Sequence, residues 1–309
     1  MNKWIKGILI VSAGLIVGGG VLAAVGVMSG GPKSLDALAA GGLLQVSAAE
    51  SDSGIAFDNS HQVWTSDFEE TLEGLPEDGT GRLTVEIGGV SLKIMEAEEK
   101  TARIRGTGIR KAQAYVEDGT LYVRAESGKK RVKWLFGGGR ESTETEGEIT
   151  LYLPEGFSAE AASLTLGTGE LAVDALQTDH LYCNAGMGSL EVRKLRAQAA
   201  EVYLGMGEVS LYDAEVSDLT ADIGMGAMYM EGAVSEDLTA SCGMGSLVME
   251  LAGNEADYDY DVSASMGSVR VGDRECAGMS AHWASDGRAA GNFDLDVSMG
   301  SVEIYFTNP

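Results

Sequence analysis

Glycine-centred turns recur every 19 residues through the middle of the chain, and hydrophobic positions recur with them. If each unit is numbered from its first glycine as position 0, positions +4 and +6 are apolar in every copy. Positions −5, −3 and −1 are also apolar, and this alternation predicts a strand with one buried face. The copies of the turn are Gly167-Thr168-Gly169, Gly186-Met187-Gly188, Gly205-Met206-Gly207, Gly224-Met225-Gly226, Gly243-Met244-Gly245, Ser265-Met266-Gly267 and Ser298-Met299-Gly300.

A repeat of this length holds two or three short strands and leaves no room for a helix. We therefore predict an all-β fold, a single-stranded parallel β-solenoid with coils of about 19 residues that rise about 4.8 Å each. Parallel crossovers are usually right-handed, so we expect a right-handed solenoid. The apolar residues occupy odd positions before each turn and even positions after it, so the chain must bend or bulge there. We expect glycine to supply the unusual backbone dihedrals that this requires.

The methionines at position +1 would form a ladder along one corner of the solenoid. We interpret them as packing, because methionine is a flexible filler of apolar gaps. A sulfur-rich metal site is the alternative interpretation, and we rank it lower because no cluster of Cys and His accompanies the ladder.

Earlier segments follow the same pattern, so we predict a solenoid over residues 56–309. Strand patterns precede the regular array at 83–87, 121–125 and 149–153. Two insertions break the period, near 127–148 and 272–292. Insertions in a solenoid form loops on its side, and such loops often carry binding.

The N-terminal part predicts a membrane anchor. Residues 7–28 contain no charged side chain, and a helix of this length is long enough to cross a bilayer. Lys3 and Lys6 precede this segment. The positive-inside rule then gives a cytoplasmic stub of residues 1–6 and an extracellular C-terminal domain at the cell membrane. Residues 29–55 are rich in Gly, Ala and Ser and predict a flexible linker. A cleaved secretory signal is the competing interpretation.

The charge and the cysteines limit the partners and the compartment. The chain carries 47 acidic and 22 basic residues, a net charge of −25, which argues against nucleic acid. Its three cysteines are too few for a disulfide scaffold. Cys183 and Cys242 fall on inward positions three coils apart, and Cys276 lies in the late insertion. Low cysteine content in an exported chain suits a Gram-positive surface.

No catalytic motif is found in the sequence, so we predict no enzyme activity, no catalytic residue, no cofactor and no metal site. Asp257-Tyr258-Asp259-Tyr260-Asp261 predicts a strand with carboxylates on one face, either a cation- or sugar-binding stripe or simply a solvated face. One basic, aromatic stretch interrupts the repeat and offers surface contacts to membrane or anionic wall polymer; the alternative is a loop that offsets the acidic body. Its residues are Lys129, Lys130, Arg131, Lys133, Trp134, Phe136 and Arg140.

Taken together, these features resemble a bacterial family of exported β-solenoid domains that are considered adhesins and are otherwise of unknown function. The resemblance is carried by an N-terminal membrane segment, by tandem units such as 164–171 and 181–190, and by the turn Leu153-Pro154-Glu155-Gly156 before the regular array. It covers residues 57–306. It implies a role at the cell surface and a link to envelope stress, and it implies no catalytic residue.

The sequence therefore predicts a membrane-anchored extracellular binding or scaffold module that is adhesin-like. Its ligand would be a glycan, a wall polymer or a protein. One alternative is the ectodomain of a regulatory membrane protein in the envelope stress response. Another is a polysaccharide-acting enzyme, since solenoids can carry paired acids on one face.

Overall fold

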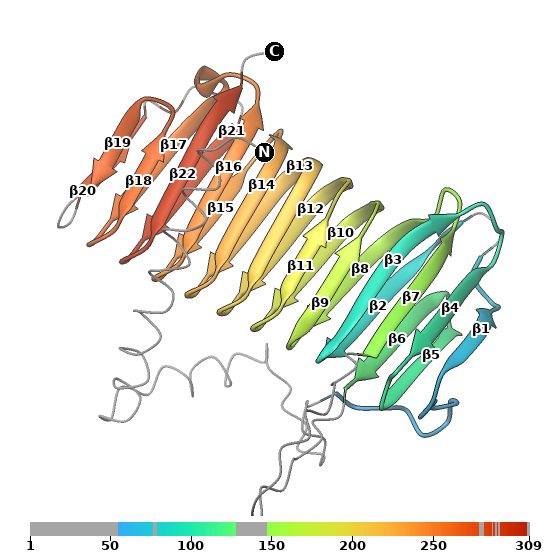
Figure 1. Ribbon diagram of the computed structural model, residues 1–309. Coiled ribbons are helices and arrows are strands. Elements are labelled where there is room, and N and C mark those ends of the chain that lie inside the picture. The colour runs from blue at the N-terminus through green and yellow to red at the C-terminus, as the bar shows by residue number, and fades with distance from the viewer. Residues whose placement is uncertain are drawn as a thin grey trace, which may run out of the picture.

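The strands of the chain lie side by side in one elongated stack, as the computed structural model shows (Figure 1). The structure describes residues 55–76, 79–127, 147–277, 281–285, 287, 289 and 291–307. The predicted stub and transmembrane helix, and the predicted linker up to residue 54, lie outside these residues. Within them, no helix is long and apolar enough to span a bilayer.

Each coil contributes one strand to each of two faces, and the glycine turn joins the two strands. Neighbouring strands within the stack are parallel and pair equivalent repeat positions, for example Leu190 with Leu171 and with Val209. The predicted stacking of 19-residue coils is thus confirmed for the regular array. In spatial order, the first face contains β6 (Thr120–Glu126), β2 (Thr80–Gly88), β8 (Ser158–Leu166), β10 (Leu176–Ala185), β12 (Leu195–Leu204), the second part of β13 (Glu208–Ile223), β15 (Leu238–Cys242), β21 (Gly291–Val297) and β17 (Tyr258–Ala264).

The second face follows the same coils on the other side of the core. Its strands, in spatial order, are β7 (Gly147–Pro154), β3 (Val90–Ala97), β9 (Gly169–Val173), β11 (Ser189–Val192), the first part of β13, β14 (Ala227–Val234), β16 (Ser246–Ala252), β22 (Ser301–Thr307) and β18 (Ser268–Val271).

The order of the coils departs from the order of the sequence at both ends of the stack. The coil of β2 and β3 lies between that of β6 and β7 and that of β8 and β9. The last coil, β21 and β22, lies between that of β15 and β16 and that of β17 and β18. A simple solenoid stacks each coil on its sequence neighbours, and this chain departs from that order at the two ends. Every coil presents the same inward apolar pattern, so this pattern cannot select the neighbour.

Antiparallel strands end the stack on both sides. At one end β5 (Lys111–Glu117) pairs with β6, β4 (Ala102–Thr107) pairs with β7, and β1 (Phe68–Leu72) pairs with β4. At the other end β20 (Ala281–Ala284) pairs with β17, and β19 (Arg274–Ala277) pairs with β18. The insertion near 272–292 thus extends the ends of both faces and is not the side loop that the repeat predicts. Of the insertion near 127–148, residues 128–146 lie outside the described residues.

The core is a narrow apolar column between the two faces. All the inward positions of one coil are buried: Leu181, Cys183, Ala185, Leu190 and Val192 are at most 2% exposed. The same holds for the earlier segments, where β2, β6 and β7 bury the alternate residues that the sequence identifies. The predicted inward phase of the strands is confirmed.

The turn glycines are required by close approach between coils and not by their dihedral angles. Among them, Gly169 alone has a positive φ, +102°. A Cβ on the glycine at +2 would lie well under 3.0 Å from the carbonyl oxygen of the equivalent glycine in the neighbouring coil, as 2.6 Å for Gly188 shows. At position 0 the same distance is 2.9 Å for Gly205 and 3.1 Å for Gly224. The overlap is therefore smaller at position 0, where serine replaces glycine in two copies, than at +2, where every copy keeps glycine.

Two substitutions in one turn compare the steric limit at position +2 with that at position 0. Gly207→Ala is expected to lower the free energy of unfolding by roughly 1–3 kcal/mol, because its Cβ would overlap the Gly188 carbonyl. Gly205→Ser is expected to lower it less, by about 1 kcal/mol or less, because its Cβ would lie 2.9 Å from the Gly186 carbonyl oxygen and a smaller shift relieves the contact. Urea unfolding followed by circular dichroism measures both. Equal losses for the two variants would contradict the steric explanation.

Candidate functional site

The methionines at position +1 form a ladder along one edge of the stack. Each backbone amide donates to the carbonyl at position 0 of the neighbouring coil: Met206 to Gly186 at 2.7 Å and Met225 to Gly205 at 2.8 Å. The bonds continue through the coil that is inserted out of order, where Met299 donates to Gly243 and Met266 donates to Ser298. Six methionines therefore follow one another without a gap, in the order Met187, Met206, Met225, Met244, Met299 and Met266.

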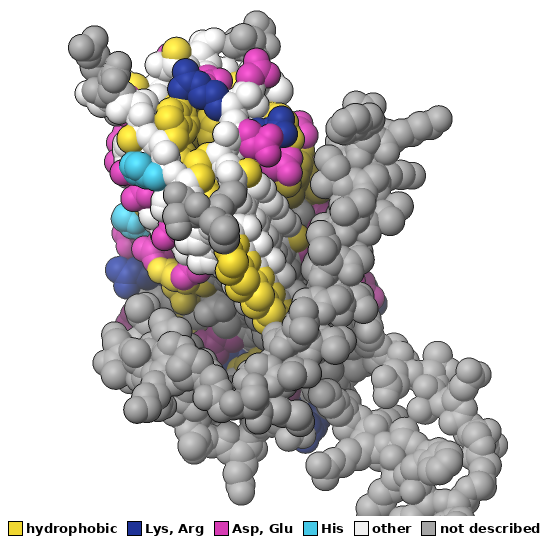
Figure 2. Space-filling model, turned by 90° about the vertical axis from the view of Figure 1, so that its left-hand side faces the viewer, with side chains coloured by type: hydrophobic (Ala, Val, Ile, Leu, Met, Phe, Trp, Pro, Cys, Tyr) yellow, Lys and Arg dark blue, Asp and Glu magenta, His cyan; other side chains and the backbone are white. Residues whose placement is uncertain are grey.

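The methionine side chains face outward. Met187 is 60% exposed, Met244 is 47% exposed and Met266 is 65% exposed, while Met225 is half-buried. Figure 2 shows an unbroken ridge of hydrophobic side chains on the side of the stack that faces the viewer. We call these six residues the methionine ridge. The interpretation of the ladder as core packing is wrong, because the turn redirects position +1 away from the column that the strands fill.

The surroundings of the methionine ridge are neutral to acidic. Position +3, next to the ridge, is occupied by Ser, Glu or Ala, with exposed carboxylates at Glu170 and Glu208. Asp222 and Asp296 are exposed and lie two residues before the turns that begin at Gly224 and Ser298. No lysine or arginine occurs between positions +1 and +3 of any of the seven units. The ridge therefore combines apolar thioethers with a local field that favours cations.

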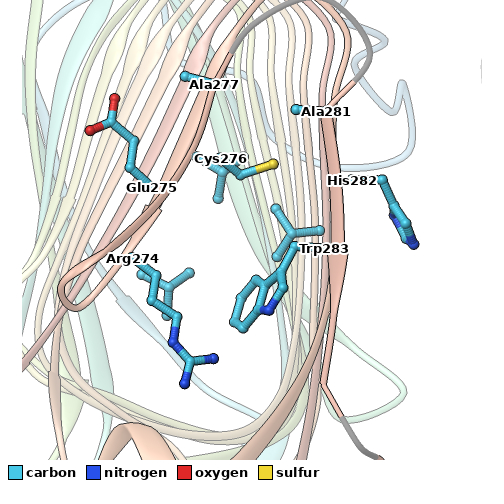
Figure 3. Close-up of a pocket in the computed structure, with 10 residues that line it drawn as sticks. Arg274, Glu275, Cys276, Ala277, Ala281, His282 and Trp283 are labelled. Atoms are coloured by element: carbon cyan, nitrogen blue, oxygen red, sulfur yellow. The ribbon is translucent and has the colours of Figure 1, made fainter.

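A cavity of about 460 Å³ opens at the end of the column, between the coil of β17 and β18 and the strands β19 and β20. In Figure 3 the side chains of Cys276 and Trp283 point into this space and His282 points away from it. Trp283 stacks on Tyr260 with ring centroids 5.3 Å apart, and the Arg274 guanidinium lies 4.9 Å from the Trp283 ring centroid. The cavity is the uncovered end of the apolar core, with one cation at its rim.

The acidic and aromatic stretch at 257–261 has a structural role. Tyr258 and Tyr260 face the core and pack on Phe293, as the alternation predicts. The Asp259 carboxylate accepts hydrogen bonds from the Ser285 hydroxyl at 2.7 Å, the Gly287 amide and the Ala289 amide. It holds the connection between β20 and β21 and does not form an open carboxylate stripe. Asp257 belongs to the short 3-10 helix η1 (Glu255–Asp257).

The other candidates from the sequence are not brought together. The basic, aromatic residues 129–140 lie outside the described residues. His61, His180 and His282 lie on separate elements, and His282 contacts Asp261 at 3.5 Å. The part of the chain that the structure describes contains no group of three or more His, Cys, Asp or Glu placed to hold a metal ion. The repeat identifies the turn residues, but it gives no sign of the outward direction of the methionines.

The three thiols differ in accessibility, and this can be measured. Burial raises the pKa of Cys183 to about 12 and also raises that of Cys242, whereas Cys276 is partly exposed in the end cavity. Because the thiolate is the reactive form, Cys276 should react with maleimide at pH 8 at least about tenfold faster than the other two. Peptide mass spectrometry of the labelled native chain measures the rates. Equal labelling of all three would contradict the buried, inward positions of Cys183 and Cys242.

The repeat, the two-faced stack and the glycine edge define a solenoid-like all-β repeat protein. The family model described as Toastrack DUF4097 matches residues 81–304, and the chain belongs to this family. The resemblance seen in the sequence is thereby confirmed. No curated protein matches the chain.

Solved structures that match this chain in a structural comparison come from several bacteria. A proposed cell adhesion protein from Clostridium sporogenes is 13% identical over 78% of this chain and 100% of its own, with a TM-score of 0.33. A proposed adhesin from Bacteroides fragilis is 10% identical over 79% and 97%, with a TM-score of 0.39. Another from Parabacteroides distasonis is 11% identical over 79% and 97%, with a TM-score of 0.35. At these TM-scores the likeness carries no functional argument.

Proposed function

We propose that this chain is a non-enzymatic, adhesin-like binding module that is anchored in the bacterial cell membrane and displays its solenoid outside the cell. The observation that carries the binding role is the methionine ridge, a continuous apolar edge on an otherwise acidic body. Contiguous exposed apolar surface on a soluble domain marks an interaction site. The uncharged segment 7–28 supports the anchor and the orientation.

The partner is a protein that presents an apolar segment flanked by Lys or Arg. Methionine side chains adapt to varied apolar surfaces, which suits contact with a peptide segment. The exposed carboxylates of Glu170, Glu208, Asp222 and Asp296 lie within three residues of position +1 in the sequence and would attract basic flanks. The ridge lacks aromatic side chains, on which sugar rings stack, so a protein is favoured over a glycan. A basic partner also agrees with the net charge of −25.

A polar version of the methionine ridge tests this proposal. The triple variant Met206→Gln, Met225→Gln, Met244→Gln should weaken binding of the full chain to intact bacterial cells at least about tenfold, because each side chain loses on the order of 1 kcal/mol of apolar burial. Flow cytometry with fluorescent chain measures the affinity. Protease treatment of the cells should abolish binding, since the partner is a protein.

A matched control changes three exposed residues that pair with one another on the first face, Glu201→Gln, Thr220→Gln and Thr239→Gln. This control should bind like the unmodified chain. Unchanged binding of the ridge variant would contradict the proposal, and so would equal losses in both variants. Binding that resists protease but is lost after glycosidase treatment would point to a glycan partner and overturn the protein assignment.

A further inference from the structure

Methionine itself, and not apolar character, is what the ridge keeps from coil to coil. Position +1 is methionine in six of the seven units. The buried positions of the same units vary freely: position +4 is Leu, Val or Met, and position +6 is Val, Leu, Met or Ile. The buried core thus needs only an apolar side chain, whereas the exposed edge keeps one residue type. The property that separates methionine from leucine and valine is its thioether sulfur, together with its flexibility.

The ladder is also kept where the order of coils changes. Met299 comes from the last coil of the sequence, yet its turn lies between those of Met244 and Met266. The backbone hydrogen bonds of these turns are 2.7 Å long, like those in the regular array. Residues distant in the sequence therefore complete one uninterrupted row of six thioethers.

The spacing of the row suits a soft metal ion. Paired strands hold equivalent residues about 4.8 Å apart. A bond between a first-row metal and sulfur is about 2.3 Å long, so an ion bridging two sulfurs in a line separates them by about 4.6 Å. Thioethers select Cu(I) over harder ions, and the side chain of methionine can turn to complete the geometry. The backbones of two adjacent coils are therefore close enough for one ion to bridge their two thioethers once the flexible side chains turn toward each other.

The electrostatic surroundings fit a monovalent cation. The ridge has no neighbouring lysine or arginine between positions +1 and +3, and Glu208 and Asp222 lie close by in the sequence and are exposed. The chain as a whole carries a net charge of −25. Such a field raises the local concentration of cations, while the sulfur donors choose among them.

We propose that the methionine ridge is a binding site for soft monovalent metal ions of the Cu(I) and Ag(I) class, each held between the sulfurs of adjacent coils. This proposal does not depend on the protein partner proposed above. It replaces the sequence-based interpretation of the ladder as packing, which the exposure of the side chains excludes. With six sulfurs taken in pairs, the ridge holds no more than about three ions.

Titration with Ag(I), which needs no reductant, tests the site directly. The full chain carries Cys276→Ser in this and the following experiment, so that no accessible thiol competes for Ag(I). It is labelled with carbon-13 at the methionine methyl groups, titrated and followed by NMR. The methyl signals of the ridge should shift together and saturate at no more than about three ions, while those of the buried Met228, Met230 and Met249 stay unchanged. Mg²⁺ at the same concentration should shift none of them. Absence of shifts at the ridge with Ag(I), or equal shifts with Mg²⁺, would overturn the proposal.

A variant of the methionine ridge that lacks three sulfurs provides a second test of the metal site. Met206→Leu, Met225→Leu, Met244→Leu keeps the apolar surface but should weaken Ag(I) binding, measured by calorimetry, at least about tenfold. The matched control Met228→Leu, Met230→Leu, Met249→Leu removes three buried sulfurs and should leave Ag(I) binding unchanged. Unchanged affinity of the ridge variant would overturn the metal site. The same leucine variant should still bind cells, so failure of the metal site and failure of the protein partner are distinguishable.

Discussion

The approach of neighbouring coils at the second glycine of each turn is the constraint on which the rest of the structure depends. No side chain fits there, because the carbonyl oxygen of the next coil already occupies the position of a Cβ. The strands on either side can then stay in register over the whole stack, and their inward residues fill a continuous column. Position +1 follows this edge from coil to coil, and its methionine side chains lie exposed at the corner.

The ends of the stack show how a repeat protein limits its own growth. A parallel stack would expose unpaired strand edges, which invite the addition of further strands. Here the parallel array ends in antiparallel strands on both faces, β4 and β5 on one side and β19 and β20 on the other. Of these, β19 and β20 are four residues long, and short edge strands disfavour the addition of further strands. Next to each end, a coil from a distant part of the sequence is inserted: β2 and β3 at one end, and β21 and β22 at the other. Each terminal coil therefore pairs with strands that are not its sequence neighbours. The cavity beside Trp283 is an opening of the apolar column at one end of the stack.

Much of this fold could be predicted from the repeat, and the parts that could not have physical reasons. The strands at Leu181–Ala185 and Leu190–Val192 follow from alternation of apolar residues, and their burial agrees. The position of Met299 between Met244 and Met266 could not be predicted, because each coil presents the same inward surface. The strands β4 and β5 lie on either side of Gly106-Thr107-Gly108, but this turn falls outside the 19-residue period, so the repeat does not identify them. The exposure of the methionines was missed because the turn breaks the alternation that fixes inward and outward positions elsewhere.

The order of the coils at the methionine ridge is the central claim, and engineered disulfides test it most directly. Cysteine pairs would be placed at Met244 and Met299, at Met299 and Met266, and at Met244 and Met266, each in a Cys276→Ser background. Neighbouring coils bring the Cα atoms to about 4.8 Å, within disulfide range, whereas two coils separate them by about 9.6 Å. The structure predicts rapid oxidation of the first two pairs and none of the third, read by mass spectrometry. A disulfide between positions 244 and 266, with none to position 299, would contradict the account.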